Sequence, residues 1–447
     1  GAAGSAPAAR PAVPAAAGAS AGAPSGTRIT RKFCTLHDNK RMALFHTPQH
    51  PPDCSTAAFL VLVWPTMGFG ASLVTVTAAL HIALRSNRVL VIHSEWNEGF
   101  FSGLHNATSC PNTRATHPWE CYFEPPSSCT VDDALRAAGV STVDQLRANP
   151  RFAQWKRGDK VDKLKRPIPT SVRTVYVDIY MPFLSKESKA ARGISPAWKS
   201  LVPRSHDNLF FGMAMQYITA LNEEFRAKLM PLMQQIIPIE LQYQSDQVVG
   251  LPVRGSDKCG KPMQGGDKEQ RGKSRFEAQC LPLSTYMEAV QRLQSFDAGI
   301  DRVVFTSEDA SYIEAAKDYA QGQGPNRPLK FVFNTYDQTL GDSRMEVVAK
   351  SGGFDHAGMM TSLWTTLELQ MAAKYYILNC NSHWHVWIYK LRSGSCGTTT
   401  PVVICLDEQS PRSKFFMCTQ GNTNGKNGLV GCTQKSIMPT KAGRRRR

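Results

Sequence analysis

The sequence predicts an α/β fold made of two domains that each contain a parallel sheet. Short apolar runs of strand length alternate with longer segments in which apolar residues recur at helical spacing. This alternation is typical of parallel strands joined by crossover helices. It occurs in both halves of the chain, and 447 residues are enough for two such domains with tails.

Composition divides the chain into four parts. Residues 1–27 are almost entirely Ala, Gly, Pro and Ser, which cannot bury enough apolar surface to offset the entropy of ordering, so we expect a disordered stalk. Residues 28–245 are expected to form the first α/β domain and residues 246–407 the second. Residues 408–447 are polar, basic and rich in Gly and Asn, which predicts an irregular extension tied down by its pair of cysteines.

The first domain opens with a β-α-β unit. Residues 58–64 and 87–92 are apolar runs of strand length, and residues 71–85 between them carry a helical apolar pattern. The preceding turn, Gly68-Phe69-Gly70, is interpreted either as a structural turn or as a phosphate cradle at a helix N-terminus. It lacks the third glycine and the downstream acidic residue of a dinucleotide site.

Three further elements complete the first domain. Thr130 is expected to cap a helix over residues 131–154. Residues 173–178 are expected to form a short strand. Residues 208–237 carry apolar residues at helical spacing, which predicts one long helix or two shorter ones.

The chain has twelve cysteines, an even number without the paired Cys-x-x-Cys spacing of a zinc site. Disulfides are therefore expected, among them bonds that staple the loop containing Cys110, Cys121 and Cys129. Residues 106–108, Asn-Ala-Thr, form a glycosylation sequon, which agrees with a secretory compartment.

The second domain opens with an apolar run that ends in charged residues. Residues 247–253 are followed by Arg254, Asp257 and Lys258. Because ligands of parallel sheets bind at the carboxyl ends of strands, Arg254 is a candidate for gripping a diphosphate through two parallel hydrogen bonds. A solvated charged turn is the alternative interpretation.

The rest of the second domain alternates regularly between helices and strands, the pattern of a doubly wound, Rossmann-like domain. The expected elements are helix 282–296, strand 302–306, helix 310–321, strand 329–333, helix 358–373, strand 375–380, helix 382–391 and strand 401–406.

The net charge of +16 indicates an anionic partner. Basic residues concentrate in residues 156–166, 258–273 and 444–447, but no recognition helix, zinc finger or RNA-binding aromatic motif accompanies them, so nucleic acid is not an expected partner. The longest apolar stretches are too short or too interrupted to span a bilayer. Because the first residue is Gly, we expect a mature luminal portion whose signal or membrane anchor has been removed.

Four segments match one enzyme family in order and spacing. They are Trp119-Glu120 through Cys129, Val253-Arg254-Gly255-Ser256-Asp257-Lys258, Glu277-Ala278 with Tyr286-Met287 beyond it, and Arg302-Val303 through Glu308-Asp309. In these segments the sequence resembles the core α1,6-fucosyltransferases and their relatives in bacterial nodulation and protein O-fucosylation. The resemblance implies a GT-B-like fold, in which two Rossmann-like domains face a cleft.

The resemblance also implies an activity, the transfer of L-fucose from GDP-fucose to a glycan or glycoprotein hydroxyl with inversion. Such a transfer needs a stabilised leaving diphosphate and a base for the acceptor hydroxyl. Glu277 is the expected base. Arg254 and Lys258 are the expected diphosphate ligands, with Lys258 alternatively orienting Glu277, and Asp257 supports the same site. No Asp-x-Asp motif occurs, so we expect neither a metal nor another cofactor.

Glu308, Asp309 and Glu368 are further donor-site candidates. Glu308 and Asp309 follow a strand, where they either receive ribose hydroxyls or hold Arg254, and Asp309 alternatively caps the next helix. Glu368 aligns approximately with a family aspartate that binds guanine. A glutamate within a helix is also typical of a solvated face.

Ser382 and His383 correspond to residues that the family places against the phosphates. His383 and His385 might suggest zinc, but side chains two apart on a helix point about 200° apart and cannot share a metal. A packed or donor-binding role is therefore expected for these histidines.

Two departures from the family pattern leave alternatives open. Pro252 and Gly255 stand where the family has a histidine and a second arginine, which predicts weaker or reshaped donor binding, and residues 261–275 form an insertion expected to be a lid or acceptor loop. The alternatives are an enzyme that uses another GDP-sugar or modifies a protein hydroxyl, and a non-catalytic secreted protein that binds acidic polysaccharide. The expected location is the Golgi lumen or the cell exterior.

Overall fold

The computed structural model describes residues in both predicted α/β domains. The described residues are 39–63, 69–93, 110, 112–115, 118–155, 171–177, 207–236, 247–255, 281–323, 328–334, 356–379, 382–396 and 402–406. The stalk, the basic tail, the sequon and the domain boundary near residue 245 lie outside these ranges and stay predictions.

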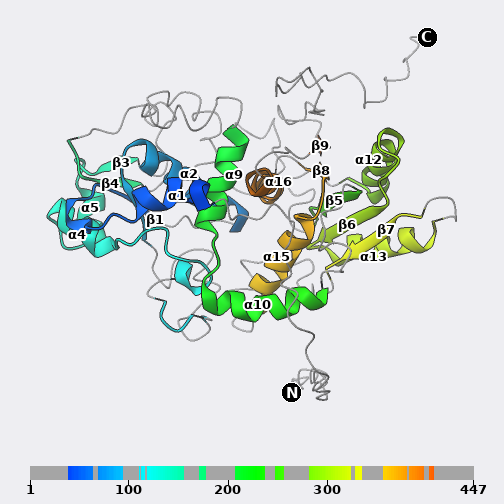
Figure 1. Ribbon diagram of the computed structural model, residues 1–447, viewed down its shortest axis with the longest axis horizontal. Coiled ribbons are helices and arrows are strands. Elements are labelled where there is room, and N and C mark those ends of the chain that lie inside the picture. The colour runs from blue at the N-terminus through cyan, green and yellow to red at the C-terminus, as the bar shows by residue number, and fades with distance from the viewer. Residues whose placement is uncertain are drawn as a thin grey trace, which may run out of the picture. The chain divides into compact units, whose positions relative to one another are not determined.

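The first sheet has four parallel strands in the order β2-β1-β4-β3 (Figure 1). They are β1 (Phe59–Val63), β2 (Val89–His93), β3 (Ala153–Trp155) and β4 (Thr174–Val177). β1 lies between two other strands and is buried along most of its length, which explains its continuous apolar run. α2 (Phe69–Arg85) connects β1 to β2, so the predicted β-α-β unit is confirmed.

The single helix expected over residues 131–154 is wrong. α4 (Val131–Ala138) begins after the predicted Thr130 cap and ends at Gly139, whose φ of 71° is left-handed. This conformation lets the Gly139 N–H satisfy carbonyl groups at the end of α4 and terminates the helix. α5 (Val143–Ala148) and β3 follow. Apolar spacing alone does not reveal such a stop.

The remaining helices of the first half are α1 (Asn39–Gln49), α9 (Asp207–Ile218) and α10 (Glu223–Ile236). α1 was not predicted. α9 and α10 correspond to the two shorter helices expected over residues 208–237. They are separate because the chain turns at Asn222, whose side-chain oxygen accepts the N–H of Phe225 at 2.8 Å and so starts α10.

Two disulfides confirm the predicted staples of the cysteine-containing loop. Cys110 bonds to Cys121, and Cys129 bonds to Cys54, which lies 75 residues earlier in the chain. Two short 3₁₀ helices, Cys54–Thr56 and Pro118–Cys121, carry two of these cysteines.

The second sheet has five parallel strands in the order β7-β6-β5-β8-β9 (Figure 1). They are β5 (Val248–Val253), β6 (Arg302–Ser307), β7 (Lys330–Phe333), β8 (Tyr375–Leu378) and β9 (Val402–Cys405). The helices of this half are α12 (Leu283–Phe296), α13 (Ala310–Gln321), α15 (His356–Gln370) and α16 (His383–Cys396). The predicted succession of strands and helices is confirmed.

Strand residues of the second sheet alternate between two buried faces. Val249, Leu251 and Val253 belong to one apolar cluster together with residues of α12. Val248 and Tyr376 belong to the other cluster, together with residues of α15 and α16. Helices therefore cover both faces, which confirms the doubly wound arrangement.

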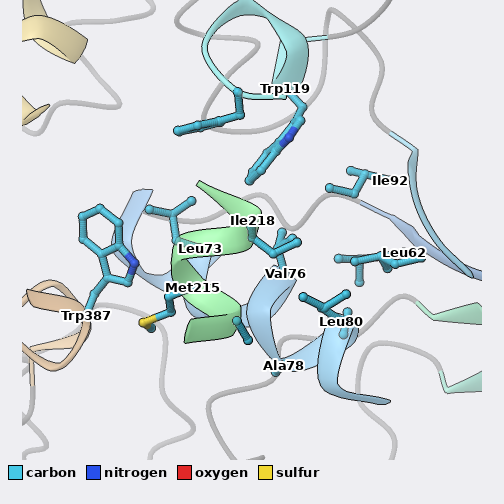
Figure 2. Packing of buried hydrophobic residues seen from close by; sticks show 14 of the residues in the cluster. Leu62, Leu73, Val76, Ala78, Leu80, Ile92, Trp119, Met215, Ile218 and Trp387 are labelled. Atoms are coloured by element: carbon cyan, nitrogen blue, oxygen red, sulfur yellow. The ribbon is translucent and has the colours of Figure 1, made fainter. Parts of the chain in front are cut away.

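α2, α9 and α16 pack against one another in one apolar core. Figure 2 shows Leu73 and Val76 of α2 beside Met215 and Ile218 of α9, with Trp387 of α16 nearby. Because α16 comes from the second half of the sequence, this core contains helices from both halves. None of the described helices is long and apolar enough to cross a membrane.

Candidate functional site

The strand order of the second sheet changes direction between β5 and β8. From β5 the chain builds outward to β6 and β7 on one side, then crosses to β8 and β9 on the other. Ligands of open α/β sheets bind at the carboxyl ends of the strands that flank such a switch point. β5 pairs with β8 at Val249 and Gly250 but with β6 as far as Val253. The pairing between β5 and β8 thus ends before the carboxyl edge is reached.

Pro252 lies beyond the last pair between β5 and β8. A proline has no N–H group, and in a central strand it normally removes a ladder hydrogen bond. Here the pairing with β8 has already ended at Gly250, so the missing N–H removes no bond to that strand. The departure from the family's histidine is therefore compatible with the strand.

Arg254 and Glu308 form an ion pair at this edge. Arg254 Nη1 lies 2.8 Å from Glu308 Oε1, and the two side chains are 22% and 30% exposed. The same carboxylate oxygen accepts the N–H of Gly255 at 3.0 Å. Glu308 thus holds Arg254 in position, which is one of the two roles expected for it. Both side chains remain partly exposed, so a ligand can reach them.

Gly255 lies against Asp309. A Cβ atom at Gly255 would meet Asp309 Cβ at 2.4 Å, which no side chain tolerates without movement of the backbone. Asp309 is itself held in place, because its Oδ1 accepts the backbone N–H of Ser311 at 3.0 Å and caps α13. The capping role expected for Asp309 is present, and it explains why the family's second arginine is replaced by glycine here.

Asn379 follows β8 on the other side of the switch point and joins three elements. Its Oδ1 accepts the hydroxyl of Tyr286 from α12 at 2.6 Å. Its backbone N–H lies 3.1 Å from Nδ1 of His385 in α16, and its carbonyl accepts the N–H of Ser382 at 3.0 Å. The start of α16 is thereby fixed to the end of β8.

His385 is buried and has the packed role expected for it. Burial, and to a smaller extent the positive charge of Arg254, lower the pKa of His385 to about 3. The imidazole is therefore neutral at physiological pH, and its Nδ1 is free to accept the Asn379 N–H.

Ser382 precedes the first residue of α16 and is 1% exposed. Its hydroxyl has no hydrogen-bond partner among the residues that the structure describes. The first N–H groups of a helix lack intrahelical partners and carry a positive partial charge, so they bind anions. A buried hydroxyl and a helix N-terminus thus follow β8, and a guanidinium follows the neighbouring β5, a set suited to phosphate oxygens.

Glu368 lies within α15 and is half-buried. Thr366, two residues earlier, accepts a hydrogen bond from Asn334 just after β7, and Gln370, two residues later, donates to the carbonyl of Val304 in β6. α15 therefore descends from the carboxyl edge onto the face of the sheet near Glu368. No ligand contact places Glu368 in the site, and its guanine role stays a prediction.

Several predicted site residues lie outside the described ranges. Asp257, Lys258, Glu277 and the insertion at residues 261–275 fall in the segment between β5 and α12, and the side chain of His383 is likewise outside the description. Their roles stay predictions. Within the described part of the chain, no group of His, Cys, Asp and Glu residues is arranged to hold a metal ion.

Sequence reasoning missed Tyr286, Asn379 and His385 as site residues. Tyr286 was assigned only to a motif, and His385 was expected to have a packed or donor-binding role. The available signal was a polar residue directly after a strand at the expected switch point, since strand ends are where parallel sheets place functional groups. Asn379 satisfies that criterion.

No family model and no curated protein matches the sequence. Among solved structures, an Arabidopsis thaliana FUT1 variant in complex with GDP is similar with a TM-score of 0.45 and 12% identity, over 85% of this chain and 79% of that one. Fucosyltransferase NodZ from Bradyrhizobium is similar with a TM-score of 0.39 and 13% identity, over 79% and 97%. POFUT1 in complex with GDP is similar with a TM-score of 0.36 and 11% identity, over 80% and 98%.

These structures belong to the enzymes that the sequence motifs resemble. With TM-scores below 0.5 and identities of 11–13%, they make no statement about what this chain binds. Its function is therefore inferred from its own residues.

Proposed function

We propose that this protein is a glycosyltransferase that moves L-fucose from GDP-fucose to a glycan or glycoprotein hydroxyl in the secretory pathway. The observation that carries the proposal is that Arg254 follows β5 while Ser382 and the N-terminus of α16 follow β8, the two neighbouring strands that flank the switch point. These groups offer positive charge and hydrogen-bond donors to a diphosphate. The four sequence motifs add the fucose-specific part of the assignment.

The geometry suits the stabilisation of a leaving nucleoside diphosphate. In the transfer, the bond between the sugar's anomeric carbon and the diphosphate oxygen breaks while the acceptor oxygen attacks from the opposite face. Negative charge develops on the diphosphate as this bond breaks. Arg254, oriented by Glu308, would then bind that charge more strongly than in the ground state, which lowers the barrier. Lys258 and His383 are proposed as further phosphate ligands, and Asp257 as their support.

Glu277 is the proposed general base. It takes the proton of the acceptor hydroxyl as the new glycosidic bond forms, so a single displacement inverts the configuration at the anomeric carbon. The proposal includes no metal ion, because cationic side chains and helix N–H groups neutralise the diphosphate. Asp309 and Glu368 are proposed to contact the ribose and guanine of the donor.

The experiment that tests this function is incubation with GDP-fucose and a panel of glycans and glycopeptides. We expect fucosylated product from the wild type, and a rate at least about 100-fold lower from Glu277→Gln, because a positioned general base typically contributes that much or more. Glu314→Gln is the control, since Glu314 is an exposed residue of α13 that pairs with Lys317. Equal rates for wild type and Glu277→Gln would remove the base assignment.

The choice of donor is tested separately by measuring donor hydrolysis with GDP-fucose, GDP-mannose and UDP-sugars. Hydrolysis of GDP-fucose alone supports the proposal. Faster hydrolysis of another GDP-sugar would change the sugar but keep the diphosphate site, whereas preference for UDP-sugars would contradict the assignment.

A further inference from the structure

Three buried side chains from three elements meet at the carboxyl end of β8. Tyr286 comes from the first turn of α12, Asn379 directly follows β8, and His385 comes from the first turn of α16. Tyr286 and Asn379 are 0% exposed and His385 is 1% exposed. Their polar groups form hydrogen bonds with one another. What they can do is determine where the start of α16 lies.

Each hydrogen bond of this group constrains a different part of the segment that leads from β8 into α16. The 2.6 Å bond from the Tyr286 hydroxyl holds the Asn379 side chain. The 3.1 Å contact between the Asn379 N–H and His385 Nδ1 ties the backbone after β8 to a side chain of α16. The 3.0 Å bond from the Ser382 N–H to the Asn379 carbonyl closes the turn that leads into the helix.

The neutral state of His385 is necessary for this arrangement. Nδ1 lies 3.1 Å from the Asn379 nitrogen and 3.2 Å from the Asn379 carbonyl oxygen. We assign the proton of the neutral ring to Nε2, so that Nδ1 accepts the Asn379 N–H. Burial and the neighbouring Arg254 both disfavour the charged imidazolium. Nδ1 of His385 therefore accepts a hydrogen bond at neutral pH, although the residue lies beside the proposed diphosphate site.

We propose that Tyr286, Asn379 and His385 form a positioning network that holds the first turn of α16 and the Ser382 hydroxyl in the geometry that binds the donor diphosphate. This inference rests on the proposed function and gives a positioning role to residues that were not among the predicted donor-site residues. Helix N-terminal N–H groups bind phosphate oxygens well only when they point at them without further adjustment. The network supplies that preorganisation at the end of β8, whereas Arg254 and Glu308 follow β5 and β6.

Tyr286→Phe tests the network most directly, because it removes one hydroxyl and leaves the ring in the core. The control is Tyr376→Phe. Tyr376 is also fully buried, and its hydroxyl also donates a 2.6 Å bond, to the carbonyl of Gln370. That bond joins β8 to the end of α15 and not to the start of α16. The two variants therefore remove equivalent bonds at different places.

GDP binding to the full chain is measured by isothermal titration calorimetry, with thermal unfolding recorded for every variant. We expect Tyr286→Phe to weaken GDP binding about tenfold, in line with the loss of one buried hydrogen bond, and Tyr376→Phe to change it less than twofold. Thermal unfolding should shift by similar amounts in both. His385→Asn, which retains an acceptor near the position of Nδ1, should bind GDP within about threefold of the wild type, while His385→Ala should lose about tenfold or more.

The outcomes separate this inference from the function on which it rests. If the wild type does not bind GDP, the diphosphate site itself is wrong, and the network has no role there. If the wild type binds GDP but both tyrosine variants bind it equally well, or are weakened equally, the positioning role is overturned while the site stands. Equal affinities of His385→Asn and His385→Ala would overturn the role of His385 in the same way.

Discussion

Replacing Arg254 with alanine removes the cation of the proposed site and leaves its partner behind. A hydrogen bond to a charged group contributes about 1.5–3 kcal/mol. The Glu308 carboxylate, 30% exposed, would then face the diphosphate without the guanidinium that now lies 2.8 Å away, and this adds repulsion of about 1 kcal/mol. The total of about 3 kcal/mol corresponds to GDP affinity about 100-fold weaker.

Calorimetric titration with GDP measures the effect, with Arg302→Ala as the matched control. Arg302 lies at the amino end of β6 in the same sheet, and its side chain is 18% exposed against 22% for Arg254. Its loss should leave GDP affinity within twofold of the wild type. Arg254→Lys keeps the charge without the planar fork and should be about tenfold weaker than the wild type. If Arg254→Ala binds GDP within threefold of the wild type, the diphosphate assignment is refuted.

Three further changes test how the structure supports the site. Gly255→Ala should destabilise the protein by about 2 kcal/mol because of its contact with Asp309, and Asp309→Gly, which removes the Cβ atom, should relieve that cost in the double variant; additive losses in chemical denaturation would contradict the contact. Between pH 6.5 and 5 the unfolded state binds a proton at His385 that the folded state does not. The free energy of unfolding should therefore fall by about 2 kcal/mol more in the wild type than in His385→Asn over this range. Parallel pH profiles of the two proteins would disprove the buried neutral histidine. Replacing Cys54 and Cys129 with serine should cost about 4 kcal/mol, because their bond closes a long loop, and an unchanged melting temperature would be inconsistent with this.

The secondary structure of the second half was predictable because local chemistry and tertiary structure agree there. The strands at residues 302–306 and 375–380 are apolar runs bounded by polar residues, and each lies buried within a sheet. The Asp309 cap was equally readable, since a short acidic side chain before a helix is a local signal.

The first half was less predictable where conformation depends on one residue. Apolar residues continue at helical spacing beyond Gly139, so the pattern predicted one helix. The left-handed backbone of Gly139 ends α4 and permits α5 and β3 to form. Similarly, α1 contains Pro48 and has only a weak apolar pattern, so its place beside the other helices depends on packing with α2 and α9.

The charged residues of the candidate site and Ser382 were predicted, but the hydrogen-bonding roles of Tyr286, Asn379 and His385 were missed. Arg254 and Glu308 were identifiable because they follow strands that deliver functional groups to one edge. Tyr286 and His385 lie in helices, where an aromatic side chain is typical of packing and nothing in the spacing indicates a hydrogen-bond partner. Tyr286 lies 93 positions from Asn379 in the chain, and His385 lies 6 positions from it. Only the fold brings Tyr286 and Asn379 into contact.

The sequence by itself determined the α/β class, the succession of elements in the second half and the charged residues at the end of β5, because all three follow from local residue patterns. The tertiary structure decided the strand order, and with it the switch point between β5 and β8. It also shows that Asp309 fills the space that a side chain at position 255 would need. Strand order and close contacts depend on which distant segments pack together, and that information is spread over the whole chain.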